Sequence, residues 1–482
     1  MATRLKLRAA LAAAALALAG CSDGNDGPIP VSAIGAPPRP ANPNLQRTDA
    51  PTAFLTEATA QGLVRFNAEG EVEPGLAQSW ILSDDGLRYT FRLRRTSWAN
   101  GAPVTAQQVA ARLRAALSPA SRNPLKPVLG AVANVVAMTD SVLEISLHGP
   151  RPNFLELLAH PEMGIIQDGG GTGPYRLAEA SPHGVRLTLP AGEDDAAPPA
   201  PEILLRGEPA AMAIARFAER RTEFVTGGTA GDLLLVRATD VPSSRLRFDP
   251  VTGLFGLAFT GAEGPLADPA IRRAMTMAID RDSIVVTLSV PRLTARTSLV
   301  SPGVFELPVP AQPDWAASPL PVRRELAARA IAALGPDTQV RVRVAMPDGP
   351  GYRLIFAHLR RDWHIVGIKA VSVPPGAPAD LRFVDSVAPA NLASWYLRHF
   401  SCGLSPICDP LADQALLAAR MAASPAERNA QFAIADRILT ELAPFIPLTA
   451  PVRWSLVSQR LTGFRPNRFA RHPAGELIAE AD

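Results

Sequence analysis

The stretch "SDDGLRYTFRLRR", Ser83 to Arg95, carries the clearest structural pattern in the sequence. Asp85-Gly86 is a typical turn dipeptide. After it, apolar residues fall on every second position: Leu87, Tyr89, Phe91 and Leu93. Because successive side chains of a strand point to opposite faces, this alternation predicts a half-buried strand that leaves a hairpin turn. It favours a turn over a catalytic carboxylate pair at Asp84-Asp85.

A second turn and a helix are predicted directly after this strand. Asn100-Gly101 is a turn signal, and Thr105 with Gln108 has the spacing of a capping box. Apolar residues then recur on one helical face, at Val109, Leu113 and Leu117. The region therefore begins with a strand and continues into a capped helix.

The second half of the chain alternates between strand and helix patterns. Residues 253–261, "GLFGLAFTG", form a short apolar run typical of a buried strand. Asp268 and Pro269 then occupy the N-cap and first positions of a predicted helix. Its apolar stripe comprises Ile271, Met275, Ala278 and Ile279. Alternation of this kind predicts an α/β fold built in layers.

The first 20 residues predict a secretory signal. A basic segment up to Arg8 is followed by an apolar run from Ala9 to Ala19. The run is shorter than the ~20 residues that span a bilayer as a helix. Residues 18–21, "LAGC", match the lipobox of bacterial lipoprotein signals, which predicts cleavage before Cys21 and lipid on its thiol. Residues 21–46, rich in Gly and Pro, are expected to form a flexible tether.

The same stretch also fits G-x-S-x-G, the nucleophile-elbow pattern of serine hydrolases, at Gly20 to Gly24. That motif requires a strand before the serine and a helix after it. Here a signal precedes Ser22 and a Gly/Pro-rich segment follows it. We therefore interpret the hydrolase pattern as a coincidence.

The charge balance argues against a nucleic-acid partner. The chain has 48 Lys+Arg and 45 Asp+Glu, a formal net charge of +3. Three of the basic residues lie in the signal, so the mature chain carries equal numbers of each sign. Removal of the signal leaves 462 residues, enough for two or three domains.

Two cysteines remain in the mature chain besides Cys21. Cys402 and Cys408 lie six residues apart in "CGLSPIC". In an exported protein such a pair favours a disulfide. A zinc site is the rival interpretation, but no second pair of Cys or His has ligand spacing. We expect no metal and no cofactor.

Four blocks, in order, resemble the extracytoplasmic solute-binding proteins of peptide/nickel ABC transporters, solute-binding family 5. The most specific block, residues 62–113, contains Pro-x-Leu-Ala-x-x-Trp from Pro74 to Trp80. The others are "GTGPYRL" (171–177), "PLADPAIRRAMTMAIDRDSIV" (265–285) and "ERNAQFAIADRILTELAPFIPL" (427–448).

The resemblance implies an α/β fold of two lobes around a cleft, with hinge closure around a ligand. Lobe one would span residues 47–259, with a subdomain at about 62–161. Lobe two would span 260–444, and residues 445–482 would return to lobe one. The chain would cross between the lobes near Leu257–Gly261 and again near Ala443–Pro451.

The resemblance also suggests ligand-binding residues within residues 381–397, "LRFVDSVAPANLASWYL". Asp385 falls on the acid that pairs with the α-ammonium of the ligand in peptide-binding members, a strong contact in a partly dry cleft. Arg382 replaces an expected Trp, and its charge favours an anionic group. Trp395 is expected to line the cleft, with a place in the hydrophobic core as the alternative.

These inferences predict a receptor and not an enzyme. We expect a monomeric, lipid-anchored, extracytoplasmic protein that captures a small solute, most simply a peptide, and delivers it to an ABC permease and its ATPase. An exported hydrolase is the alternative of a different class, although H-E-x-x-H and S-x-x-K are absent and the seven histidines are scattered. A degenerate binding protein that acts as a sensor or assembly partner is the third.

Overall fold

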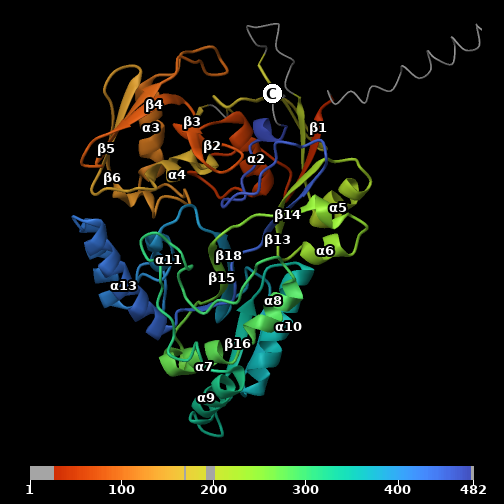
Figure 1. The fold of residues 1–482 in the computed structure, drawn as a ribbon, viewed down its shortest axis with the longest axis vertical. Coiled ribbons are helices and arrows are strands. Elements are labelled where there is room, and N and C mark those ends of the chain that lie inside the picture. Colours follow the sequence, from red (N-terminus) through yellow and green to blue (C-terminus); the bar gives the residue numbers. More distant parts are fainter. Residues whose placement is uncertain (1–26, 168–169, 191–200, 479–482) are drawn as a thin grey trace, which may run out of the picture.

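The computed structural model describes residues 27–167, 170–190 and 201–478. Within them the chain forms two lobes, each around its own β-sheet (Figure 1). The predicted signal and the lipidation site at Cys21 lie outside the described residues. No described helix is both long enough and apolar enough to cross a membrane.

Lobe one is built on a seven-stranded sheet with the order β10-β11-β12-β1-β13-β20-β14. In chain order its strands are β1 (Ile29–Ile34), β10 (Arg176–Ser181), β11 (Gly184–Thr188), β12 (Ile203–Glu208), β13 (Phe224–Thr229), β14 (Leu246–Phe248) and β20 (Arg453–Val457). Strand β1 runs parallel to both β12 and β13. The helices of this lobe are α2 (Ala50–Thr59), α5 (Ala210–Ala218) and α6 (Leu233–Arg237).

Strand β1 corrects the prediction that residues 21–46 form a tether. Ile29, Val31 and Ala33 are at most 1% exposed, and the strand lies inside the sheet. Ser32, on its other face, donates a hydrogen bond of 2.5 Å to Glu208. The strand is only six residues long, and the surrounding Gly and Pro residues masked its alternation.

The subdomain of lobe one carries the strand predicted from Ser83–Arg95. Its antiparallel sheet has the order β4-β5-β7-β6. The subdomain contains β2 (Val64–Phe66), β3 (Val72–Pro74), β4 (Ala77–Leu82), β5 (Arg88–Leu93), α3 (Ala106–Leu117), β6 (Val132–Ala137), β7 (Val142–Leu147) and α4 (Phe154–Ala159). Along β5, Tyr89, Phe91 and Leu93 are buried, which confirms the alternation. The capping box of Thr105 and Gln108 is also present.

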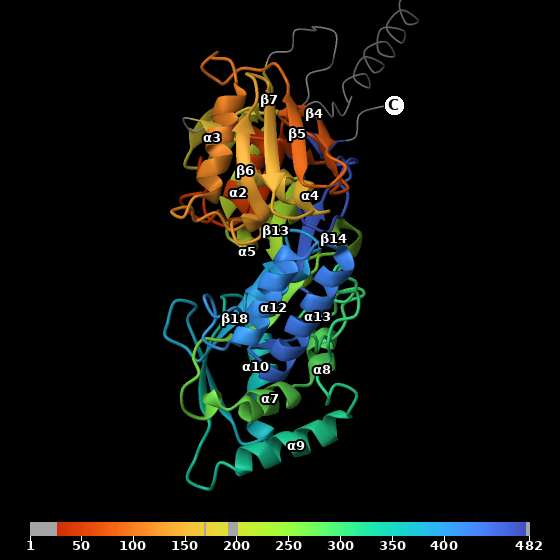
Figure 2. The same cartoon turned by 90° about the vertical axis from the view of Figure 1, so that its left-hand side faces the viewer.

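Lobe two is built on a five-stranded sheet with the order β17-β16-β18-β15-β19. Its strands are β15 (Gly253–Phe259), β16 (Arg341–Ala345), β17 (Lys369–Val373), β18 (Leu381–Val387) and β19 (Phe445–Pro447). Its helices are α7 (Pro269–Met277), α8 (Arg281–Leu288), α9 (Leu320–Ala332), α10 (Pro350–Ile365), α11 (Ala393–Arg398), α12 (Pro410–Met421) and α13 (Pro425–Leu442). Asp268 caps α7 as predicted, and the stripe on this helix is buried. Helices α12 and α13 pack side by side below the subdomain (Figure 2).

The remaining elements are short. They are β8 (Ile166–Gln167), β9 (Gly170–Gly171) and the 3-10 turns Leu129–Ala131, Pro161–Met163, Ser243–Arg245, Gly264–Ala267 and Ala474–Glu476.

The first crossing between the lobes differs from its predicted position. Strand β14 belongs to the sheet of lobe one, whereas β15 pairs along its whole length with β18 of lobe two. The first crossing therefore lies at residues 249–252, before the predicted boundary at 259/260. Strand β19 also joins the sheet of lobe two, so the chain returns at residues 448–452. This segment overlaps the predicted crossing near Ala443–Pro451, although the predicted domain boundary at 444/445 lies before it. The apolar run 253–261 is thus the first strand of lobe two and not the last of lobe one.

Cys402 and Cys408 form a disulfide in the loop between α11 and α12. Among the described residues, no group of three or more His, Cys, Asp or Glu side chains is arranged to hold a metal ion.

Candidate functional site

A cavity of ≈ 420 Å³ lies where the two lobes meet. Lobe one contributes the start of α2, the end of β13, Arg453 at the start of β20 and the C-terminal segment 469–472. Lobe two contributes Asp385, Ser386 and Val387 at the end of β18. Ligand pockets for small molecules usually measure about 300–1,000 Å³. The cavity is therefore large enough to hold a small solute.

Asp385 lines this cavity, but its carboxylate already has partners from the same chain. Its Oδ1 accepts a hydrogen bond of 2.7 Å from Arg453 Nη1, and its Oδ2 accepts one of 2.5 Å from the Tyr352 hydroxyl. The two charged side chains are 8% and 18% exposed. The ion pair connects β18 of lobe two with β20 of lobe one. The negative charge of Asp385 is thus balanced by a cation of the same chain.

The ionisation of the two partners reflects this arrangement. Burial and the negative charge of Asp385 raise the pKa of the Tyr352 hydroxyl. For Arg453, burial disfavours the charged form, but the carboxylate of Asp385 outweighs burial and raises the pKa of the guanidinium. Tyr352 is therefore a hydrogen-bond donor, and Arg453 is a fixed cation, at physiological pH.

Glu57 is a second carboxylate at the cavity, on the face of α2 that meets it. Within the described part of the chain, its side chain has no hydrogen-bond partner and no ion pair. Burial raises the pKa of this carboxyl, and the positive charges of Arg471 and His472 oppose the shift only in part. Among the acids that line the cavity, Glu57 is the one that makes no direct contact with a hydrogen-bond donor or a cation of the described residues.

The other charged residues at the cavity are bound to the protein itself. Asp49 caps α2 and accepts a hydrogen bond of 3.2 Å from the Thr52 amide. Arg471 forms an ion pair of 2.8 Å with Glu162. His472 lies 3.3 Å from Asp249. These contacts position the walls of the cavity.

The structure does not bring Arg382 or Trp395 to the cavity. Arg382 is exposed on β18, three positions from Asp385, and its guanidinium contacts the carbonyl of Pro375. Trp395 is 8% exposed and stacks edge-on against Tyr396 and His399, with 4.8 Å between the ring centroids in each pair. The prediction that these two residues bind the ligand therefore has no support in the geometry.

Two residues that line the cavity, Glu57 and Arg453, were not predicted from the sequence. Glu57 is the one acid in a helix that is otherwise made of Ala, Thr, Pro, Phe and Leu. A lone acid in such a helix is a signal that could have been noticed. Arg453 follows the second crossing between the lobes, and no local pattern marks it.

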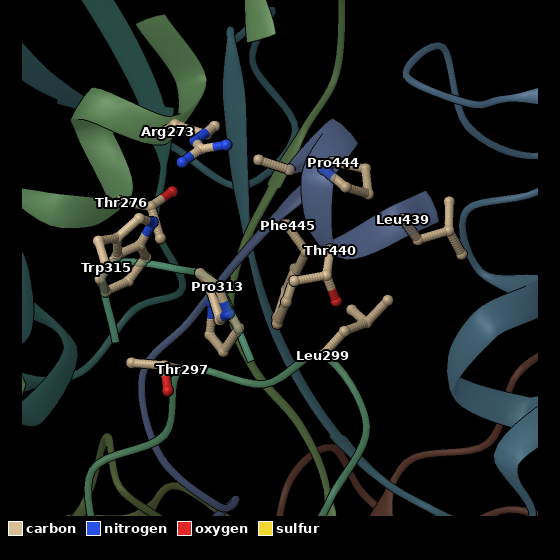
Figure 3. A pocket seen from close by; sticks show the side chains of 12 residues that line it. Arg273, Thr276, Thr297, Leu299, Pro313, Trp315, Leu439, Thr440, Pro444 and Phe445 are labelled. Atoms are coloured by element: carbon tan, nitrogen blue, oxygen red, sulfur yellow. The ribbon is translucent and has the colours of Figure 1, made fainter. Parts of the chain in front are cut away.

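A second cavity lies inside lobe two, among side chains from α7, α13 and the segment 297–315 (Figure 3). Its volume is ≈ 20 Å³, which suits about one water molecule. Arg273, its charged residue, forms an ion pair of 2.5 Å with Asp314. This cavity is too small for a solute.

The amino-acid sequence of the chain is similar to those of known proteins. Residues 71–381 match the model of the bacterial extracellular solute-binding proteins, family 5. The chain is 26% identical to the probable di/tripeptide-binding protein 5 of Pseudomonas aeruginosa, over 85% of this chain and 88% of that protein. It is 29% identical to the oligopeptide-binding protein OppA of Bacillus subtilis, over 49% of this chain and 50% of that protein. That second match therefore spans only half of the relative.

Solved structures share the fold over nearly the whole chain. The murein tripeptide-binding protein MppA of Escherichia coli superposes with a TM-score of 0.79 at 20% identity, covering 94% of this chain and 97% of that one. OppA of Haemophilus influenzae, in complex with a peptide, gives the same TM-score at 18% identity, covering 94% and 98%. At this level of identity the likeness shows the two-lobed fold.

Proposed function

The chain belongs to the bacterial extracellular solute-binding proteins of family 5, and from that premise we propose that it is a lipid-anchored receptor for a small peptide. Proteins of this family bind solutes outside the cytoplasm and deliver them to ABC permeases; they are not enzymes. The peptide, the lipid anchor and the position of the binding site are the parts that we propose. The binding site is the ≈ 420 Å³ cavity between the lobes.

The observation that carries the proposal is the pair of carboxylates at this cavity. Glu57 lies on lobe one and Asp385 on lobe two. A ligand with an ammonium group can form a charge-assisted hydrogen bond with Glu57, which has no direct partner of its own. Each oxygen of Asp385 accepts one hydrogen bond from the protein and keeps a further lone pair for a ligand donor. The arrangement thus favours a ligand that carries an amino group, such as a peptide.

Capture needs no covalent chemistry. Closing the lobes removes water from the cavity and strengthens each contact between charges inside it. Because the ligand would contact both lobes, its binding energy would favour the closed arrangement. Names of relatives agree with this class of ligand, since they include di/tripeptide-, oligopeptide- and murein tripeptide-binding proteins.

A thermal-shift screen of the purified mature chain tests the choice of ligand. The panel comprises di-, tri- and oligopeptides, the same peptides with acetylated amino termini, a nickel–histidine complex and oligosaccharides. Binding to the folded state raises Tm by mass action, so we expect peptides with free amino groups to raise Tm and acetylated peptides to raise it less. Stabilisation by the nickel complex or a sugar, with no effect of any peptide, would contradict the proposal.

The proposed lipid anchor rests on residues 18–21 and has its own test. In cells, the wild-type protein is expected in the membrane fraction, and Cys21→Ser is expected to release the protein from it. Stable anchoring requires two or more acyl chains, so loss of the lipidated thiol removes it. Equal distribution of both proteins between the fractions would argue against lipidation.

A further inference from the structure

Four arginines gather where the subdomain meets the helices of lobe two. We call Arg151, Arg398, Arg420 and Arg428 the arginine cluster. Arg151 precedes α4 in the subdomain, whereas the other three lie on α11, α12 and α13. Arg151, Arg398 and Arg420 line one small cavity, and the charge of Arg428 acts on Arg151 as well. The cluster shares no residue with the cavity between the lobes.

No carboxylate of the described residues forms an ion pair with any member of the cluster. The acid that influences it most directly is Glu306, which is 4% exposed. Its Oε2 accepts a hydrogen bond of 3.2 Å from the Ala393 amide at the start of α11. One acid, already engaged by a helix start, thus acts on Arg151 and Arg428, and the cluster keeps an excess of positive charge.

The arginines themselves find few partners in the protein. Arg398 donates a hydrogen bond of 3.2 Å to the Pro127 carbonyl, and Arg420 donates to the Gly130 carbonyl. Arg428 is 3% exposed, and its buried Nε has no partner among the described residues. The guanidinium of Arg151 likewise makes no hydrogen bond there. Arg428 is buried and the other three arginines are half-buried. Charged groups taken out of water are normally paired, so the cluster lacks a counter-charge.

The lack of a counter-charge also affects the pKa values of the arginines in the cluster. Burial, followed by the charge of Arg428, lowers the pKa of Arg151 to about 10, although Glu306 opposes the shift. Burial and Arg420 lower the pKa of Arg398. Burial and like charges act in the same direction, against the charged form. An anion among the arginines would oppose the repulsion and favour the charged form of both groups.

A small cavity lies within reach of three of the four arginines. Arg151, Arg398 and Arg420 line it, together with the polar side chains Asn153 and Ser394 and with apolar groups that include Phe154 and Phe432. Its volume is ≈ 20 Å³, room for about one particle of the size of water. A peptide or a nucleotide does not fit.

We propose that this cavity is a binding site for a monatomic anion of the size of chloride. The anion would accept hydrogen bonds from the guanidinium groups of the arginine cluster and neutralise part of its charge. Because Arg151 belongs to lobe one while Arg398 and Arg420 belong to lobe two, the anion would also join the subdomain to α11 and α12. It would therefore stabilise the contact between the lobes independently of the solute.

Thermal unfolding of the ligand-free mature chain provides the first test. Chloride is raised from about 5 to about 300 mM, with gluconate replacing it to keep the ionic strength constant. We expect Tm to rise by about 1–3 °C with chloride and to level off at high concentration. The same Tm in chloride and in gluconate would overturn the proposal. A rise with phosphate alone would also overturn it, because phosphate exceeds the size of the cavity.

Removal of one arginine gives a sharper signature. At low chloride, Arg151→Gln should unfold at a higher Tm than the wild type, since a repulsive charge is gone. At high chloride this advantage should disappear, because the variant binds the anion more weakly. Arg92→Gln is the matched control, since Arg92 is an exposed arginine of the same subdomain. A chloride response in Arg151→Gln equal to that of the wild type would count against the site.

A crystallographic test on the wild type does not depend on how the variants fold. In crystals grown with bromide in place of chloride, we expect an anomalous peak within hydrogen-bond distance of the guanidinium groups of Arg151 or Arg398. The absence of a peak at the cluster, with bromide peaks elsewhere on the protein, would overturn the assignment.

Discussion

Asp385 and Arg453 form an ion pair of 2.7 Å that joins the sheet of lobe two to the sheet of lobe one. Both side chains are mostly buried at the cavity that we propose as the solute site. The resemblance suggested that Asp385 is an unpaired carboxylate that binds an ammonium group of the ligand. Instead, the chain supplies its own cation. A ligand must therefore bind beside an existing ion pair, and the second carboxylate, Glu57, gains importance.

Loss of Arg453 should destabilise the protein markedly. Arg453→Gln leaves Asp385 buried with only Tyr352 as a partner, and breaking a buried pair costs about 3 kcal/mol or more. Arg343→Gln is the control: it breaks an exposed Arg–Asp pair of lobe two, with Asp380, and solvent screening should make this loss much smaller. Urea unfolding measures both changes. Similar losses for the two variants would show that the pair between the lobes adds no special stability.

Replacement of Glu57 should separate ligand binding from stability. Glu57→Gln keeps the shape of the side chain and removes a charge that burial disfavours. We expect unchanged or slightly higher stability. Affinity for an amino-bearing ligand should fall about tenfold or more, since a hydrogen bond to a charged group contributes about 1.5–3 kcal/mol. Calorimetry with a peptide from the screen measures the affinity, and exposed Glu179→Gln is the control. Unchanged affinity would remove Glu57 from the site.

Local patterns predicted the parts of the fold that depend on neighbours in sequence. The alternation around Phe91, the capping box at Thr105 and the cap at Asp268 all concern residues within a few positions of one another. Strand β1 was not predicted, because six residues between Gly- and Pro-rich segments give too short a pattern of alternation. The first crossing was misplaced because a buried strand such as β15 has the same apolar pattern in either lobe.

The site was predicted less well, because it depends on contacts between distant residues. Asp385 was placed by resemblance, and the structure does bring it to the cavity. Its ion pair with Arg453 could not be foreseen, since Arg453 lies 68 positions away. Arg382 was expected from its place in the motif, but it lies exposed on β18, away from the cavity. The arginine cluster joins residues from α11, α12, α13 and the subdomain, and no stretch of sequence shows that they meet.

Asp436 on α13 should make stability depend on pH. It is 1% exposed, and burial raises the pKa of its carboxyl to about 6. Its Oδ2 accepts a hydrogen bond of 2.6 Å from the Ala311 amide, and its Oδ1 has no partner in the described residues. The folded state therefore prefers the protonated acid. This contribution is fully present below the unfolded pKa of about 4 and is lost as pH rises through about 6.

Asp436→Asn tests this prediction, because asparagine can accept the same hydrogen bond without a charge. Relative to the wild type, the variant should gain up to about 3 kcal/mol of stability between pH 4 and pH 8. Urea unfolding at several pH values gives the difference. A constant difference across this range would mean that Asp436 does not titrate there.

The disulfide between Cys402 and Cys408 should contribute modestly and locally to stability. It closes a short loop between α11 and α12, for which loop-closure entropy predicts about 2 kcal/mol. The Cys402→Ser/Cys408→Ser double variant should therefore fold, with a lower midpoint of urea unfolding and an unchanged slope. Since α11 and α12 each carry an arginine of the proposed anion site, the variant should also bind chloride more weakly. Reductant should lower the stability of the wild type by the same amount and leave the double variant unaffected. An equal effect of reductant on both proteins would mean that the disulfide does not stabilise the fold.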